Sequence, residues 1–257
     1  MRISLLWPRA WRLATAALPL CASLLFSTAA WSGTQAQQYQ QFSTQANTMA
    51  VAAVLHFVTD PRPGGTPGRT GLENLVEAEQ LTRQQAARLG LSSPALDRVL
   101  DRLETLHKLS PDATDYQPLL VELLDQHNQL SQQIAETYQQ HGVTPLAELL
   151  NRQSQRVALL RLNAATRNAR ILGSHSLLDE QQFVQLDQEI TQGFSQLESA
   201  LSTAESQQLQ RQQQAYRFVR ATLLETGTLK NSAALELYIA RMLAWLDTRA
   251  VLADAES

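Results

Sequence analysis

The stretch PLAELLNRQSQRVALLRLNAATRNARIL, residues 145–172, decides the fold class of this chain. Its apolar residues recur at alternating steps of three and four, the spacing that places side chains on one face of an α-helix. The residues of this apolar seam are Leu146, Leu150, Val157, Leu160, Ala164 and Ile171. A seam of this length predicts a long helix that packs lengthwise against its neighbours.

Similar amphipathic patterns occupy most of the remaining chain. They predict further helices over residues 37–58, 72–89, 94–106, 118–138, 183–201, 203–223 and 235–245. No window shows the strict alternation of apolar and polar residues that is typical of a half-buried strand. We therefore expect an all-α protein built as an antiparallel helical bundle.

Capping residues indicate where several of these helices begin. Asp179 precedes the helix around 183–201, and Gln182 lies three residues later, which is the spacing of a capping box. The same spacing occurs at 202–205 and predicts a kink or a new helix there. Ser93 followed by Pro94 predicts a capped start with proline in the first turn.

The break at 141–145 divides the pattern into two halves, residues 37–141 and 142–257. Each half is expected to contain a long first helix, two middle helices and a closing helix. A distant duplication is one interpretation of this similarity. The break is short, so we expect the halves to be stacked along shared long helices or to pack directly.

Residues 1–36 have the composition of a secretory signal peptide. Three arginines accompany an apolar run over 13–30, and small residues offer cleavage sites near 30–36. No later segment approaches the roughly 18 uninterrupted apolar residues of a membrane-spanning helix. We therefore expect a periplasmic protein with a cleaved signal, the alternative being an uncleaved N-terminal anchor.

The charge of the mature chain disfavours a nucleic-acid partner. Loss of residues 1–30 lowers Lys+Arg from 21 to 18 against 24 Asp+Glu, so the net charge falls to near −6. Proteins that bind nucleic acid normally gather lysine and arginine on one face. We expect no nucleic-acid binding.

Motifs for catalysis or metal binding are not found. Cys21, the only cysteine, lies in the signal, and no two of the five histidines are three or four residues apart. No phosphate loop, nucleophile elbow or zinc motif occurs. Asp187 and Glu189 are two residues apart, which predicts a solvated helix face rather than a catalytic pair. The sequence predicts no enzyme activity, no cofactor and no metal site.

Polar residues within 145–172 suggest a binding site instead. Gln153 and Arg167 occupy seam positions where apolar residues are expected, and Arg156, Asn163 and Arg170 recur every seven residues beside them. Guanidinium groups and a carboxamide suit a small anion that is nitrate-like or a carboxylate. The alternative is that these arginines pair with Asp or Glu of adjacent helices.

The segment from Asn163 to Ser174 resembles a helix signature of the periplasmic sensor module of type IV pilus methyl-accepting chemotaxis transducers. Asn163, Ala165 and Arg167 match that signature directly, and Arg170-Ile171-Leu172 match it after an offset of one residue. Thr166 replaces a glycine of the signature, and the first half of the chain is similar only in its expected architecture.

This resemblance implies an antiparallel helical bundle that binds a small ligand, nitrate or nitrite in some relatives, or a pilin-like protein. In relatives the event passes to a cytoplasmic signalling domain, so this chain is expected to act through a membrane signalling or pilus protein, or as a homodimer. In such a site Arg167 and Arg170 would supply positive charge, and Asn163 would form a directed hydrogen bond to the ligand. Gln153 would make a supporting contact, and Arg156 would lie at the rim.

The sequence thus predicts a non-catalytic, periplasmic sensory or ligand-binding protein. The competing interpretation is a structural or chaperone-like helical protein that binds another protein through a groove or a helix face. Its basis is the Gln-rich segment 207–214, whose polar surface does not suit a deep ligand cavity.

Overall fold

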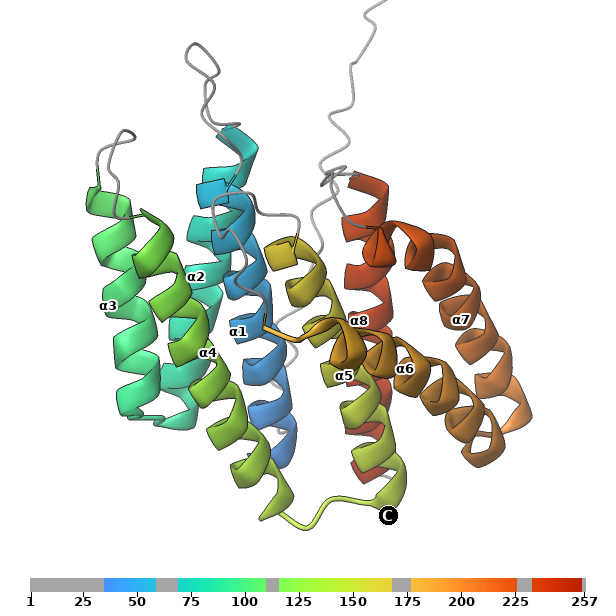
Figure 1. The fold of residues 1–257 in the computed structure, drawn as a ribbon. Coiled ribbons are helices and arrows are strands. Elements are labelled where there is room, and N and C mark those ends of the chain that lie inside the picture. Colours follow the sequence, from blue (N-terminus) through green and yellow to red (C-terminus); the bar gives the residue numbers. More distant parts are fainter. Residues whose placement is uncertain (1–34, 59–68, 110–115, 168–176, 226–232, 256–257) are drawn as a thin grey trace, which may run out of the picture. The chain divides into compact units, whose positions relative to one another are not determined.

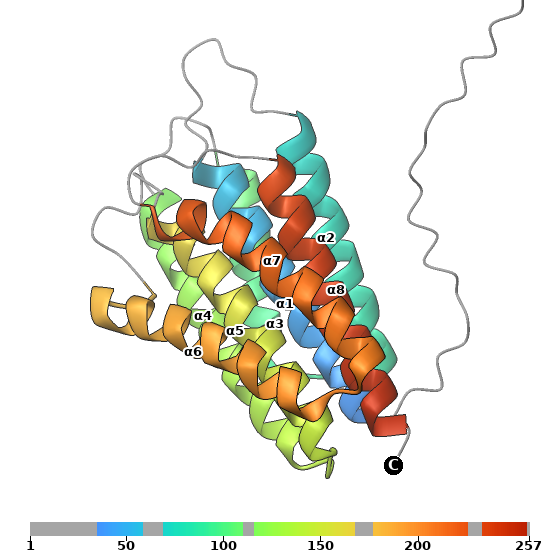
Figure 2. The ribbon, with the colours of Figure 1, turned by 90° about the vertical axis from the view of Figure 1, so that its right-hand side faces the viewer.

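The structure is a computed structural model that describes residues 35–58, 69–109, 116–167, 177–225 and 233–255. Within these ranges every regular element is an α-helix, which confirms the prediction of an all-α fold. Most consecutive helices run in opposite directions, whereas the helix over residues 180–200 crosses the preceding helix obliquely, as Figures 1 and 2 show. The elements are α1 (Gln35–Val58), α2 (Arg69–Leu89), α3 (Pro94–Lys108), α4 (Tyr116–Gln139), α5 (Pro145–Arg167), α6 (Glu180–Ala200), α7 (Thr203–Leu224) and α8 (Ala233–Ala255).

The helices bury their apolar faces in two cores. The first core gathers side chains of α1 to α4, among them Phe42, Leu103 and Leu124, none of them more than 1 % exposed. The second gathers side chains of α5 to α8, among them Phe194 and Met242. Each helix has an apolar stripe that it cannot bury alone, and packing around the two cores removes these stripes from water.

Helix α5 contributes to both cores. Most of its buried apolar side chains belong to the second core, whereas Leu162 and Ala165 pack in the first. Helix α1 contacts both α5 and α8, and Figures 1 and 2 show these three helices side by side. Because α4 ends at Gln139 and α5 begins at Pro145, the two groups of helices pack directly and share no continuous long helix.

Two predicted helix starts behave differently. Asp179 caps α6 as predicted: its Oδ1 accepts a hydrogen bond from the Gln182 backbone at 2.8 Å, and Gln182 Oε1 accepts one from the Asp179 backbone at 3.0 Å. Ser93 stands before α3, but its hydroxyl makes no capping bond and donates to Gln133 Oε1 of α4 at 2.8 Å. The predicted start is therefore confirmed, with Ser93 at the N-cap and Pro94 in the first turn, but the capping hydrogen bond is not formed because a partner on another helix takes this hydroxyl.

Candidate functional site

Arg167 and Arg156 of α5 form ion pairs with two different glutamates of α6. Arg167 Nη2 lies 2.7 Å from Glu180 Oε2, and its guanidinium carbon lies 4.0 Å from the ring centroid of Phe183. Arg156 Nη2 lies 3.1 Å from Glu189 Oε2. The two glutamates are separated by about 13.5 Å along the axis of α6, at 1.5 Å per residue. The structure therefore does not bring these guanidinium groups to one point.

Gln153 is buried against α6. Its side chain is 1 % exposed, and Nε2 donates a hydrogen bond to the carbonyl oxygen of Ile190 at 2.9 Å. A Cβ at Gly193 would lie only 2.0 Å from Gln153 Oε1, so the glycine is what allows the amide to approach α6 this closely. Gln153 thus holds α5 against α6.

The remaining residues of the predicted anion site are not gathered around a cavity. Asn163 is fully buried, and its backbone oxygen accepts a hydrogen bond from Thr166 Oγ1 at 2.9 Å. Arg170 lies outside the described residues, which stop at 167 and resume at 177. Arg161, which the sequence analysis did not single out, is 3 % exposed and pairs with Glu236 of α8. The arginines at 156, 161 and 167 therefore join α5 to α6 and α8, as the alternative interpretation expects.

A polar junction layer, formed by Gln40, Thr44, Ser154 and Asp247, lies where α1, α5 and α8 meet. The Asp247 carboxylate accepts hydrogen bonds from Gln40 Nε2 at 3.0 Å, Thr44 Oγ1 at 2.6 Å and Ser154 Oγ at 2.6 Å. All three donors are uncharged. Burial raises the pKa of Asp247 above its ordinary value, although the three hydrogen bonds act in the opposite direction. The junction layer therefore joins the two groups of helices through the Asp247 carboxylate, whose hydrogen-bond donors are all neutral.

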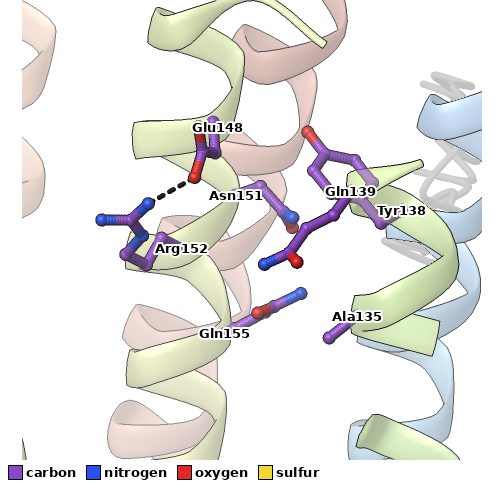
Figure 3. Close-up of a pocket in the computed structure, with 7 residues that line it drawn as sticks. All are labelled: Ala135, Tyr138, Gln139, Glu148, Asn151, Arg152 and Gln155. Atoms are coloured by element: carbon purple, nitrogen blue, oxygen red, sulfur yellow. Dashed lines mark hydrogen bonds and ion pairs between the residues drawn. The ribbon is translucent and has the colours of Figure 1, made fainter. Parts of the chain in front are cut away.

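A cavity of about 120 Å³ lies between the C-terminal part of α4 and the N-terminal part of α5 (Figure 3). Asn151 is 4 % exposed, and Figure 3 shows its side chain directed from α5 toward α4. Its Oδ1 has no hydrogen-bond partner, and leaving a buried polar atom unsatisfied costs about 1–3 kcal/mol. The residues that line this junction cavity are Ala135, Tyr138, Gln139, Glu148, Asn151, Arg152 and Gln155.

Three carboxylates act on Tyr138, which forms part of the wall of the junction cavity. Burial raises the pKa of Tyr138, and the carboxylates of Asp254, Glu148 and Asp247 raise it further. Arg152 forms an ion pair with Glu148 one turn away on the outer part of α5. Tyr138 is therefore a neutral phenol in a negative field at physiological pH.

Sequence reasoning missed both the junction layer and the junction cavity. Asn151 and Ser154 are three residues apart on α5, and Gln40 and Thr44 are four apart on α1, so each pair shares one helix face. Polar residues that repeat at helical spacing were the available signal. Nothing within α8 marks Asp247, because its partner Gln40 is 207 residues away in the chain.

A second carboxylate, Asp187 of α6, is 3 % exposed, so the prediction of a solvated face is wrong at this position. Arg220 Nε and Nη2 donate to its two oxygens at 2.8 and 2.6 Å, and the Tyr216 hydroxyl donates at 2.6 Å. Burial alone would raise the pKa of Asp187, but the hydrogen bonds from Arg220 and Tyr216 lower it below the ordinary value. A bidentate arginine thus compensates for the burial of this carboxylate.

Among the residues that the structure describes, no three His, Cys, Asp or Glu side chains are grouped closely enough to hold a metal ion. The same part of the chain contains no helix with the length and apolar character needed to cross a membrane. No family model, curated protein or solved structure matches this chain.

Proposed function

We propose that this chain is an exported, non-catalytic helical protein that binds a small polar solute in the junction cavity. The observation that carries the proposal is the cavity between α4 and α5, which is lined by the polar side chains of Gln139, Asn151 and Gln155.

The position of the junction cavity supports a sensory role. Asn151 lies one helical turn from Ser154, whose hydroxyl binds Asp247 in the layer between the two cores. A solute that binds one arrangement of α4 and α5 around the cavity more tightly than another shifts the population toward that arrangement. We propose that a membrane signalling protein or a pilus protein, or a second copy of this chain, responds to this shift.

The anion expected from the sequence would have to compete with acidic partners already in place. Arg167 pairs with Glu180 and Arg156 with Glu189, so an anion at either guanidinium must displace a carboxylate. In the junction cavity the amides of Gln139, Asn151 and Gln155 are uncharged, so a solute that binds them displaces no carboxylate. The geometry therefore favours the junction cavity over the arginines of α5 as the ligand site.

A thermal-shift scan of the purified chain tests the proposal. The panel contains the small anions nitrate, nitrite, sulfate and acetate, small amines, and small neutral polyols, all at matched ionic strength. A solute at 100 times its dissociation constant adds about 2.7 kcal/mol of stability. For a chain of this size that corresponds to a rise of about 5–10 °C in Tm.

The variant Asn151→Ala should lose this response while it keeps its helical circular dichroism. The matched control is Asn128→Ala, which removes an amide from an exposed position of α4. A response that survives Asn151→Ala places the ligand elsewhere, and a panel without any response contradicts the proposal.

A structural or chaperone-like role is the second candidate, and the outer surface of α7 and α8 favours it. Phe218 is 67 % exposed, and its ring lies 5.1 Å from that of Tyr238 on α8. The Gln-rich part of α7 also presents exposed amides at Gln207, Gln208 and Gln210. Size-exclusion chromatography with light scattering separates the two candidates, because a stable extended oligomer indicates scaffolding and a compact monomer or dimer that responds to a solute indicates sensing.

A further inference from the structure

We propose that the outer side of α7 and α8 binds α2 of a second copy of this chain. The first surface, the α7–α8 face, consists of four exposed residues, Arg211, Phe218, Leu237 and Arg241. The second, the α2 face, consists of four exposed residues, Leu72, Glu73, Val76 and Glu77. This inference goes beyond the proposed function, because neither face belongs to the lining of the junction cavity.

Two exposed apolar side chains form the centre of the α7–α8 face. Phe218 of α7 is 67 % exposed and Leu237 of α8 is 48 % exposed. Figure 2 shows α7 and α8 side by side, and the Phe218 ring contacts the ring of Tyr238, the next residue after Leu237. The two apolar side chains therefore lie at the same level along the helix pair.

Two arginines give the α7–α8 face a positive charge. Trp245 Nε1 of α8 donates a hydrogen bond to Gln208 Oε1 of α7 at 2.9 Å, which is a second contact between these antiparallel helices. Arg211 on α7 and Arg241 on α8 each stand between this hydrogen bond and the ring contact. Both arginines are exposed, and within the described part of the chain neither forms an ion pair.

The α2 face has the complementary combination of apolar and acidic side chains. Leu72 and Val76 are 43 % and 40 % exposed and lie four residues apart. Glu73 and Glu77 follow them at the same spacing, so the four side chains share one side of the helix over two turns. Leu75, by contrast, is buried in the first core. Both glutamates are exposed, and Glu77 forms no ion pair with a described residue.

The complementarity of the two faces favours a second copy as the occupant. Of the seven large apolar side chains that are exposed in the described part of the chain, four belong to these faces. Docking of one face on the other removes all four from water and sets the two glutamates against the two arginines. Aromatic and arginine side chains are also enriched at protein interfaces. An anionic membrane would suit the arginines but would leave the α2 face exposed.

Sedimentation velocity of the full chain over a wide range of concentration at pH 7 tests the inference. We expect association at low salt that grows with concentration and weakens in about 1 M NaCl, where the Debye length is about 3 Å. Residues 1–36 are common to the parent and to every variant, so a comparison among these proteins isolates the two faces. A monomer at every concentration overturns the inference.

Charge reversal on either face should raise the dissociation constant of the self-association about tenfold or more. Arg241→Glu tests the α7–α8 face, and Glu77→Arg tests the α2 face. Controls with the same change of net charge are Arg88→Glu at the end of α2 and Asp125→Arg on α4, two exposed positions outside both faces. Controls that weaken the association as much as the test variants would show that net charge alone governs it, and would overturn the inference.

A mixture of the Arg241→Glu and Glu77→Arg proteins shows whether the two faces meet each other. The first protein keeps an intact α2 face and the second an intact α7–α8 face, so the mixture should associate more strongly than either protein alone. No recovery in the mixture, with normal circular dichroism of both variants, overturns the inference. Binding of the parent to phosphatidylglycerol vesicles without self-association would assign the α7–α8 face to a membrane surface and would also overturn it.

Discussion

Two carboxylates packed among the helices, Asp187 and Asp247, have opposite environments. Asp187 lies between α6 and α7, where Arg220 supplies a bidentate cationic partner and Tyr216 a further donor. Asp247 lies at the junction of α1, α5 and α8, where its three hydrogen-bond donors are neutral. The pKa of Asp187 is lowered and that of Asp247 is raised.

Only at Asp187 does a cationic partner compensate for the energetic cost of burying the carboxylate. Asp187 forms an ion pair with Arg220 inside one group of helices, and this pair contributes to the stability of the fold. Asp247 joins the two groups and retains an unfavourable electrostatic environment, a property that is often found at functional sites. The variants below test this distinction, from the largest expected effect to the smallest.

Replacement of Arg220 should cause the largest loss of stability. Arg220→Met leaves the carboxylate of Asp187 without its cation, and we expect a loss of about 2 kcal/mol in the free energy of unfolding. This is less than the about 3–5 kcal/mol of a fully buried pair, because the Arg220 side chain is 47 % exposed. Urea denaturation at pH 7 measures the change. Equal losses in Arg220→Met and in the exposed control Arg217→Met would show that the pair with Asp187 is unimportant.

Replacement of Arg167 should cost less. Its partner Glu180 is 74 % exposed, so the ion pair contributes little, and the contact with the Phe183 ring adds a cation–π term. We expect Arg167→Ala to lower the free energy of unfolding by about 1 kcal/mol and to leave solute binding at the junction cavity unchanged. Loss of binding in Arg167→Ala, with normal circular dichroism, would return the ligand site to the arginines of α5.

Replacement of Asp247 should change stability by less than about 1 kcal/mol at pH 7, because its surroundings disfavour the ionised carboxylate and Asp247→Asn keeps a side chain that forms hydrogen bonds. Thr44 and Ser154 can rotate their hydroxyls to suit either amide atom. Urea denaturation of Asp247→Asn and Arg220→Met at pH 7 measures the difference between their free energies of unfolding. If Asp247→Asn lost as much free energy of unfolding as Arg220→Met, the surroundings of Asp247 would have to favour its ionised form, which would contradict this account.

The contributions of the two carboxylates to stability should change with pH in opposite directions. Asp187 has a lowered folded pKa, so its contribution is present above the ordinary value of 3.8 and is lost as pH falls through the folded pKa. Asp247 has a raised folded pKa, so its contribution is complete below 3.8 and is lost as pH rises through the folded pKa.

The measurement compares the free energy of unfolding of the parent, Asp187→Asn and Asp247→Asn between pH 3 and pH 8. Asp187→Asn should remove a rise of stability with pH, and Asp247→Asn should remove a fall. His127 also titrates here, because burial lowers its pKa to about 4, but it is common to all three proteins and cancels in the differences. Parallel profiles for the two variants would contradict the assigned environments.

Local sequence signals predicted the helices well, because they depend on residues a few positions apart. The capping box of Asp179 and Gln182 is one such signal, and the apolar seam around Leu150 and Val157 is another. Ser93 shows the limit of this reasoning. Its hydroxyl has a choice of partners, and the one it takes, Gln133, is 40 residues away.

The candidate site was less accessible to sequence reasoning. The positions of Arg156 and Arg167 on α5 were evident from the spacing, but their partners Glu189 and Glu180 depend on how α6 packs across α5. The residues that line the junction cavity are divided between α4 and α5, and no periodicity within either helix specifies it. Asn151 becomes informative only once its place in the lining of this cavity is known.

Hydrogen–deuterium exchange with and without a saturating concentration of a solute that raises the Tm of the chain tests the central claim most directly. Exchange should slow at the C-terminal part of α4, the N-terminal part of α5 and around Asp247, and stay unchanged around Asp187 and Arg220. Protection centred on Arg167 and Glu180, or no protection at all, would contradict the claim that the junction of the two cores is the ligand site.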